Sequence, residues 1–179
     1  VATRMRNDNV SIRIKGWLNQ SMNDLAASYE FPALHAMANF NSAVGVQSYL
    51  LEDNLYWLKA MWVDGRTPPM VWPTTEADLA SCDPYFRSQR GTVYYYYLND
   101  RTLGLWRIPA SVETFTYTYQ KRPAKMVNDD DRSSLPPEWD QLVLLKTMIR
   151  AYEYDRNDLV NSAKADFSFF LKDRSKTVY

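Results

Sequence analysis

Residues 114–120, Thr-Phe-Thr-Tyr-Thr-Tyr-Gln, alternate strictly between threonine and an aromatic residue until the final glutamine. Successive side chains of a β-strand point to opposite faces, so Phe115, Tyr117 and Tyr119 should share one face of a sheet. The pattern predicts an antiparallel strand whose aromatic face points into a core and whose threonine face is less buried. Such a strand needs neighbouring strands, which the preceding part of the chain must supply.

The neighbouring strands are expected within a β-rich stretch over 40–123. The run 92–98 contains four consecutive tyrosines, and a polar turn separates it from the apolar run 103–108. Two such runs joined by a short polar turn predict a β-hairpin. We expect further elements in the same stretch: strands at 44–51 and 55–63, an extended segment at 67–73, and a short helix over 75–81 capped by Thr74 or Thr75.

Helical periodicity flanks this stretch on both sides. Apolar residues spaced by four and three predict a helix over 8–31, which should end before Pro32. A helical hairpin is predicted over 135–172, with Pro137 near its first turn, Asn157 as the cap of its second helix and a polar C-terminal tail at 173–179. The predicted fold is α+β: one domain over 1–179, in which the N-terminal helix and the C-terminal hairpin form a helical core around an inserted antiparallel β region.

Composition argues against several classes of function. The 179 residues carry 21 Lys plus Arg and 21 Asp plus Glu, and this balance does not favour general binding to nucleic acid. The chain has one histidine, His35, one cysteine, Cys82, and five glycines without a phosphate-binding pattern. No apolar run approaches the ~20 residues of a membrane helix. We therefore expect no catalytic residue, no metal site, no cofactor and no membrane association.

Two groups of acidic residues are candidate sites. Asp129, Asp130 and Asp131 could hold a divalent cation, but their spacing does not match an EF-hand loop, and a solvated loop beside Arg132 is the favoured interpretation. The second group could supply a carboxylate pair for glycoside hydrolysis, as in a cell-wall hydrolase, although acidic residues near a helix start more often cap the helix or interact with its dipole. Its candidates are Glu76, Asp78 and Asp83.

The aromatic content is the most informative feature for function. Aromatic residues make up 15% of the chain, with 13 Tyr and 6 Trp, and such side chains suit surfaces that become buried on assembly. Of the tyrosines at 94–97, one alternate pair can join a core while the other faces solvent, a sugar or another chain. The outward pair can either pack against aromatic residues of a neighbouring strand or form an interface with another molecule. A carbohydrate-binding module that uses the Tyr-rich sheet is the alternative function. The predicted interface residues are Trp62, Trp72, Tyr94, Tyr96 and Trp106.

A basic stretch near the N-terminus contains Arg4, Arg6, Arg13 and Lys15. It could meet phosphate, although four charges in a neutral protein give a weak and salt-sensitive attraction. An interaction with acidic groups of a neighbouring subunit would explain this basic stretch equally well.

An ordered set of short motifs resembles the head–tail adaptor proteins of tailed bacteriophages, in particular the adaptor between portal and tail in short-tailed phages. The resemblance spans nearly the whole chain. One motif departs from the family pattern, because Leu51 stands where proline is usual in the segment 49–53. The other motifs are Trp17-Leu-Asn with 22–26, Phe31-Pro-Ala-Leu, Trp106-Arg-Ile-Pro, Tyr119-Gln-Lys-Arg-Pro followed by 129–131, Leu135-Pro-Pro-Glu-Trp, Arg150-Ala-Tyr-Glu and Asp166-Phe.

The resemblance implies a structural virion protein without an active site. Its partners would be the portal protein, a tail tube or nozzle protein, and further copies of itself in a closed, typically dodecameric ring, through which DNA passes without specific binding. The location would be the head–tail junction of the virion, after assembly in the host cytoplasm, which suits a chain with a single cysteine. The resemblance also makes the C-terminal segment the portal-docking element, with Lys172, Arg174, Lys176 and Tyr179 as the predicted contacts.

Overall fold

The computed structural model describes residues 2–155 and 159–175, and the side chains of 11–155 and 159–172. The chain divides into two units, which are described separately. The helical unit consists of Val1–Leu34 and Arg122–Tyr179, and the β unit is His35–Lys121. The predicted α+β class is confirmed. That both units act together as one adaptor domain stays a prediction.

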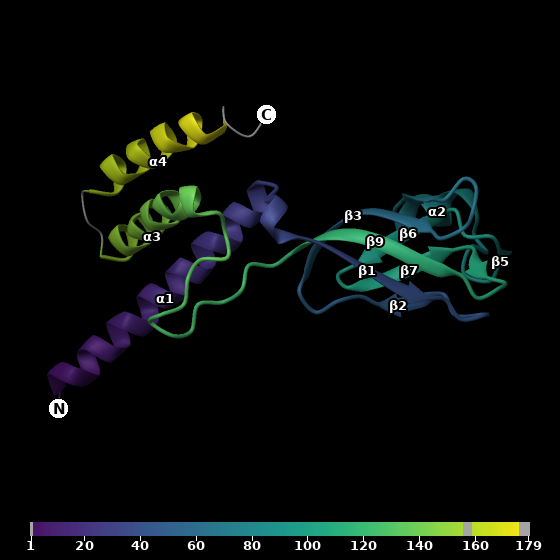
Figure 1. Cartoon of the computed structure of the whole chain (residues 1–179), viewed down its shortest axis with the longest axis horizontal. Helices are drawn as coiled ribbons and strands as arrows, with labels where there is room; N and C mark the ends of the chain where they lie inside the picture. Colours follow the sequence, from purple (N-terminus) through teal and green to yellow (C-terminus); the bar gives the residue numbers. More distant parts are fainter. Residues whose placement is uncertain (1, 156–158, 176–179) are drawn as a thin grey trace. The chain divides into compact units, whose positions relative to one another are not determined.

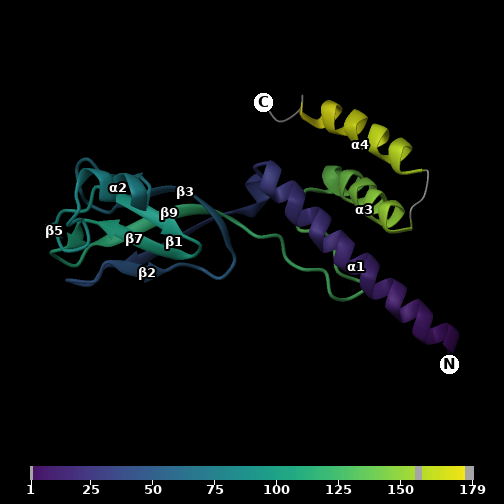
Figure 2. The same cartoon turned by 180° about the vertical axis from the view of Figure 1, so that it is seen from behind.

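Helix α1 (Ala2–Ser28) opens the helical unit (Figures 1 and 2). Its predicted apolar stripe is buried only towards the C-terminal end, where Met22 and Leu25 belong to the core, while Ile14 remains exposed. Helix α1 ends at Ser28, before Pro32 as predicted, and a short 3-10 turn, η1 (Pro32–Leu34), follows.

The C-terminal helices complete this unit. The 3-10 turn η2 (Pro137–Trp139) leads into α3 (Asp140–Asp155), and α4 (Val160–Ser175) follows. Helix α3 lies between α1 and α4 in Figures 1 and 2 and packs against both. The core centres on Trp139, whose ring meets Phe31 edge-on at 4.8 Å between centroids. The predicted cap Asn157 lies outside the described residues.

The β unit contains a seven-stranded sheet in the order β1-β9-β3-β4-β6-β7-β2. Neighbouring strands are antiparallel except β4 and β6, which run parallel. Its strands are β1 (His35–Asn41), β2 (Ser48–Leu50), β3 (Leu55–Val63), β4 (Met70–Pro73), β6 (Tyr95–Asn99), β7 (Thr102–Trp106) and β9 (Thr114–Lys121). Helix α2 (Glu76–Cys82) follows β4, and a small parallel pair is formed by β5 (Arg90–Gly91) and β8 (Ile108–Pro109).

Strand β9 carries the alternating sequence and lies between β1 and β3, which explains its strong pattern. Phe115, Tyr117 and Tyr119 are all buried in the β core, as predicted. Thr116 on the other face is also buried, because β9 has a neighbour on each side. The predicted hairpin is confirmed as β6 and β7, and the predicted cap Thr75 accepts a hydrogen bond from the Asp78 amide at the start of α2.

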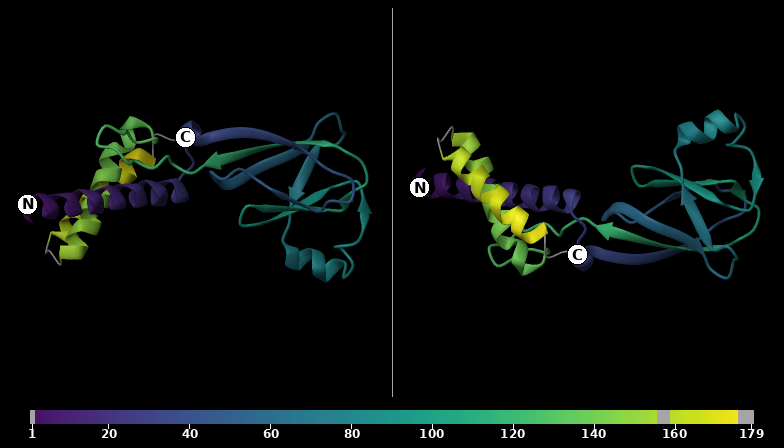
Figure 3. Two further views of the ribbon diagram at one scale, coloured as in Figure 1. Left: turned by 90° about the horizontal axis from the view of Figure 1, so that it is seen from below. Right: turned by 90° about the horizontal axis from the view of Figure 1, so that it is seen from above.

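The sheet curls until its two outer strands approach each other. The rings of Phe40 on β1 and Tyr49 on β2 lie 4.8 Å apart between centroids, although these strands stand at opposite ends of the strand order. Figure 3 shows strands of the β unit crossing at wide angles rather than lying in one flat layer. The curl encloses a core between the two halves of the sheet.

Two sequence expectations about strands need correction. Strand β1 was not predicted, because His-Ala-Met-Ala-Asn-Phe-Asn is poor in β-branched residues and owes its conformation to pairing with β9. The strand expected over 44–51 is only β2, Ser48–Leu50. The chain turns before it at Gly45, whose φ of 81° lies in the left-handed region that glycine tolerates.

Candidate interaction surfaces

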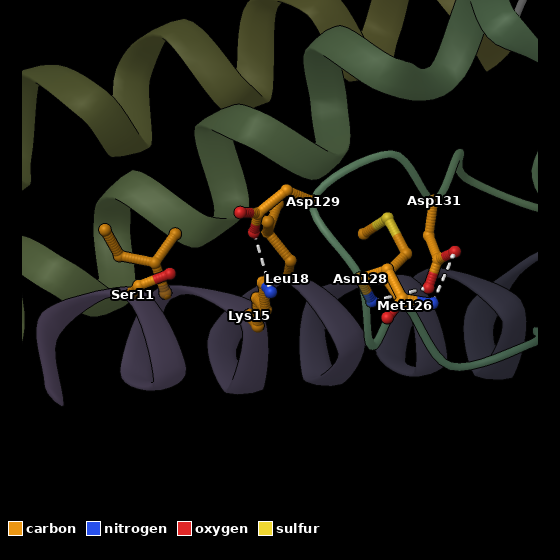
Figure 4. Close-up of a pocket in the computed structure, with 8 residues that line it drawn as sticks. Ser11, Lys15, Leu18, Met126, Asn128, Asp129 and Asp131 are labelled. Carbon is orange, nitrogen blue, oxygen red and sulfur yellow. Dashed lines mark hydrogen bonds and ion pairs between the residues drawn. The ribbon is translucent and has the colours of Figure 1, made fainter. Parts of the chain in front are cut away.

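The three consecutive aspartates lie on a loop, and Figure 4 shows Asp129 and Asp131 beside α1. Nζ of Lys15 lies 2.7 Å from Asp129 Oδ1 and donates to the carbonyl oxygen of Val127 at 2.8 Å. Asp131 accepts hydrogen bonds from the backbone N–H groups of Asn128, at 2.8 Å, and Val127, at 2.6 Å. These two hydrogen bonds, that of Asn128 first, hold the pKa of Asp131 below its ordinary value. Asp129 and Asp131 therefore stabilise the loop and attach it to α1.

The acidic candidates near α2 also take part in local structure. Glu76 forms an ion pair with Arg87, and Asp78 accepts a hydrogen bond from the hydroxyl of Thr75 at 2.6 Å. Asp83 follows the helix, and its carboxylate accepts a hydrogen bond from the backbone N–H of Tyr85 at 2.9 Å. Within 2–155 and 159–175, no group of three or more His, Cys, Asp or Glu residues could hold a metal ion.

An aromatic stripe crosses strands β3, β4, β6 and β7 on the outer face of the sheet. Trp62 pairs with Met70, Met70 and Trp72 are two residues apart on β4, Trp72 pairs with Tyr95, and Tyr95 pairs with Trp106. Residues in register share a face, so these side chains form one continuous row. The rings of Tyr95 and Trp106 lie 5.5 Å apart between centroids. Met70, Trp72 and Tyr95 are exposed, with Trp72 at 57%, and the other two are half-buried.

The structure separates the consecutive tyrosines by face. Tyr96 is only 5% exposed and belongs to the β core, and burial raises its pKa. Tyr94 is exposed, and the guanidinium of Arg66 lies 5.4 Å from its ring centroid. Of the predicted interface residues, the structure brings Trp62, Trp72 and Trp106 into one row, leaves Tyr94 exposed outside it and places Tyr96 in the interior.

Sequence reasoning missed Met70 and Tyr95 as members of the aromatic stripe. The sequence does contain a signal for Tyr95, because a hairpin with a two-residue turn after Asn99 pairs Tyr95 with Trp106. Met70 had none, since its place depends on the pairing of β3 with β4 and on the parallel pairing of β4 with β6.

The helical unit carries a second surface feature, a groove made by two adjoining hollows along α1. The first, of about 430 Å³, is lined by Ile14, Lys15, Leu18, Met126 and the aspartate loop (Figure 4). The second, of about 490 Å³, shares Leu18, Met126 and Asp131 with the first and extends to α3, where Val143 and Leu144 line it. We call both hollows together the α1–α3 groove.

Asn19 holds the connector segment against α1. Its side-chain Nδ2 donates to the carbonyl oxygen of Met126 at 2.9 Å, and its Oδ1 accepts from the Met126 amide at 2.8 Å. Asn19 belongs to the Trp-Leu-Asn motif on which part of the family resemblance rests. The two hydrogen bonds position Met126 between the two hollows of the α1–α3 groove.

The remaining predicted contact residues lie at the two ends of the chain. Arg13 donates a hydrogen bond to the hydroxyl of Tyr154 at 2.6 Å, so it serves contacts within the helical unit. Lys172 is exposed on α4. The side chains of Arg4, Arg6 and Arg174, and residues Lys176 and Tyr179, lie outside the part of the chain that is described.

A family model for the SU10 adaptor protein matches residues 1–176. The chain belongs to the SU10 adaptor protein family. Membership in the SU10 adaptor family confirms the resemblance to phage adaptors and makes the chain a structural component of a virion. No curated protein matches the chain. Across the described residues, no helix is long and apolar enough to span a membrane.

Proposed function

We propose that this SU10 adaptor is a subunit of a closed, dodecameric head–tail adaptor ring. The ring docks on the portal, extends the DNA channel and attaches tail proteins at the head–tail junction, after assembly in the host cytoplasm. The observation that carries the proposal, beside family membership, is the aromatic stripe of Trp62, Met70, Trp72, Tyr95 and Trp106 on the β unit. The stripe provides the contact with a neighbouring protomer or a tail protein.

The size of the stripe supports this role. A fully exposed aromatic side chain presents ~150–250 Å². The five side chains of the stripe are only partly exposed, and together they offer on the order of 400 Å² of surface. The largest apolar patch of a typical monomer measures about 300–600 Å² and is often functional. An area of about 400 Å² is also about half of the ~800 Å² that each partner buries in a stable interface. Trp and Tyr are also the residue types that carry the largest share of binding energy in interfaces.

The charge of the chain agrees with a channel wall. DNA must slide through such a ring, and a strongly basic lining would bind the phosphates and slow its passage. The equal numbers of acidic and basic residues, 21 of each, avoid this attraction.

Portal docking is assigned to the C-terminal segment with Lys172, Arg174, Lys176 and Tyr179. This segment combines three basic residues with one acidic residue, Asp173, and Lys172 is exposed at its start. A chain that ends after Leu171 and an untruncated double variant Lys172→Glu/Lys176→Glu both test the assignment. Both should bind portal rings more weakly, and unchanged binding by both would refute the C-terminal contact.

The proposal as a whole is tested by light scattering on the purified protein, alone and with portal rings. We expect a ring, or a monomer that joins the portal in a fixed ratio. A monomer that ignores the portal and instead binds glycans saturably would contradict the proposal and favour the carbohydrate-binding alternative, for which exposed rings on a sheet are also suited.

A further inference from the structure

Helix α4 presents one aromatic side chain outward, away from the core of the helical unit. Phe167, Phe170 and Leu171 pack on the core, whereas Phe169 is 70% exposed. The ring of Phe169 meets that of Phe170 nearly perpendicularly, at 5.6 Å between centroids. Phe169 is therefore an apolar knob supported by a neighbouring ring and available to a partner.

The α1–α3 groove offers an apolar socket of sufficient size. Leu18, Met126, Val143 and Leu144 line its larger hollow, and Leu144 is 55% exposed. This hollow measures about 490 Å³. A cavity of ~150 Å³ is enough to hold a benzene molecule, so a phenylalanine ring and part of its helix can enter.

We propose that Phe169 of one copy inserts into the α1–α3 groove of a second copy. This proposal rests on the ring function proposed above and names one contact between neighbouring subunits. The partner is a second copy of this chain, because knob and socket are both present on the same unit but on different helices. Helix α3 packs against both α1 and α4 and lies between them in Figures 1 and 2, so α4 and the α1 side of the groove lie on different sides of α3.

The charges around knob and socket are complementary. Asp131, Asp140 and Arg132 line the larger hollow. Asp166 stands three residues before Phe169 on α4, and side chains three apart lie on the same side of a helix. With Phe169 in the hollow, Asp166 can face Arg132, and this pair favours one direction of docking.

The symmetry of such a contact agrees with a ring. The two surfaces differ, so the contact is heterologous, and each bound copy leaves a free knob and a free socket for the next. A repeated heterologous contact forms a closed ring when a whole number of subunit-to-subunit rotations adds up to a full turn.

Disulfide trapping tests the contact directly. Cys82 is the one cysteine of the chain, so Cys82→Ser provides a cysteine-free background. In this background we would mix the single variants Phe169→Cys and Leu144→Cys under conditions where the wild type assembles, alone or on portal rings. A disulfide forms only when the two Cα atoms come within about 7 Å. We expect crosslinked dimers from this mixture and few from Ser168→Cys, an exposed control on α4, mixed with Leu144→Cys.

A second variant separates this proposal from the general function. Phe169→Ser should keep the wild-type melting temperature, because the side chain is exposed, and should raise the concentration for half-assembly about thirtyfold, as expected for loss of an aromatic hot spot. Normal assembly of Phe169→Ser together with absent crosslinks would overturn the knob-and-groove contact while the ring function stands. A wild type that assembles neither alone nor on portal rings would overturn both.

Discussion

The ring of Tyr97 on β6 lies over the α-carbon of Gly104 on β7. A β-carbon added to Gly104 would lie 2.1 Å from Cζ of Tyr97 and 2.5 Å from Cε1 and Cε2. The two residues are partners in the β6–β7 register. The ring of the buried Phe86 lies 6.4 Å from that of Tyr97 between centroids.

Gly104→Ala should therefore destabilise the β unit by about 1–3 kcal/mol, the usual cost of overpacking. Urea unfolding measures the change. Combining Gly104→Ala with Tyr97→Leu should cost less than the sum of the single changes, because the smaller side chain makes room for the methyl group. Additive losses would show that the two residues do not interact in this way.

A buried pair of hydroxyls joins α1 to α3. The Thr147 hydroxyl oxygen lies 3.1 Å from that of Ser21 and 2.7 Å from the carbonyl oxygen of Val143. Thr147→Val should cost about 1–2 kcal/mol in unfolding free energy, because the buried Ser21 hydroxyl loses its partner. The double variant Ser21→Ala/Thr147→Val should recover part of this loss, and a double variant less stable than Thr147→Val alone would contradict the pairing.

Asn19→Ala should loosen the connector at Met126. Two hydrogen bonds are lost, each worth about 0.5–1.5 kcal/mol. Hydrogen exchange at the Met126 amide should accelerate, while the exposed neighbour Gln20 provides a control in Gln20→Ala. Equal exchange rates in both variants would show that Asn19 does not hold the connector.

Trp72 tests the aromatic stripe without disturbing the core. Because its side chain is 57% exposed, Trp72→Ser should change the unfolding free energy by less than about 0.5 kcal/mol. Binding to the tail protein or to neighbouring copies should weaken about thirtyfold, as for an interface hot spot of ~2 kcal/mol. Tyr85→Ser is the matched control, since Tyr85 is 75% exposed and lies outside the stripe. Calorimetry that finds both variants equal to the wild type would remove the stripe from the interface.

Alkaline pH should destabilise the β unit through Tyr117. Burial, followed by the charge of Glu52 and the proximity of Tyr119, raises the pKa of Tyr117 to about 12. In the unfolded chain this hydroxyl ionises near its ordinary value of about 10. Because the folded state keeps the proton longer, stability is complete below about pH 10 and falls as the pH rises towards 12.

Unfolding midpoints measured across this pH range, with tyrosinate absorbance followed in parallel, check the prediction. Tyr117→Phe should show a smaller loss over the same range, although Tyr96 and Tyr119 also have raised pKa values through burial. A variant that loses stability as steeply as the wild type would exclude Tyr117 as a contributor.

Sequence alone determined the elements whose signals are local. The alternation at 114–120 is visible because β9 has two neighbours and a buried aromatic face, so period 2 survives in its residue types. Pro32 and Pro137 mark helix boundaries, and Thr75 caps α2, because these effects depend on nearby backbone groups. The order of the motifs was enough to indicate the adaptor family.

Tertiary structure alone decided which of the aromatic residues face outward. Four tyrosines in a row carry no information about which face is buried, and only the sheet order sends Tyr96 inward and Tyr95 outward. The parallel pairing of β4 with β6 brings Trp72 beside Tyr95, although 22 residues separate them in the sequence. Strand pairing between distant segments is set by the total burial of the core rather than by local preference, so the aromatic stripe and the α1–α3 groove exist only in the folded chain.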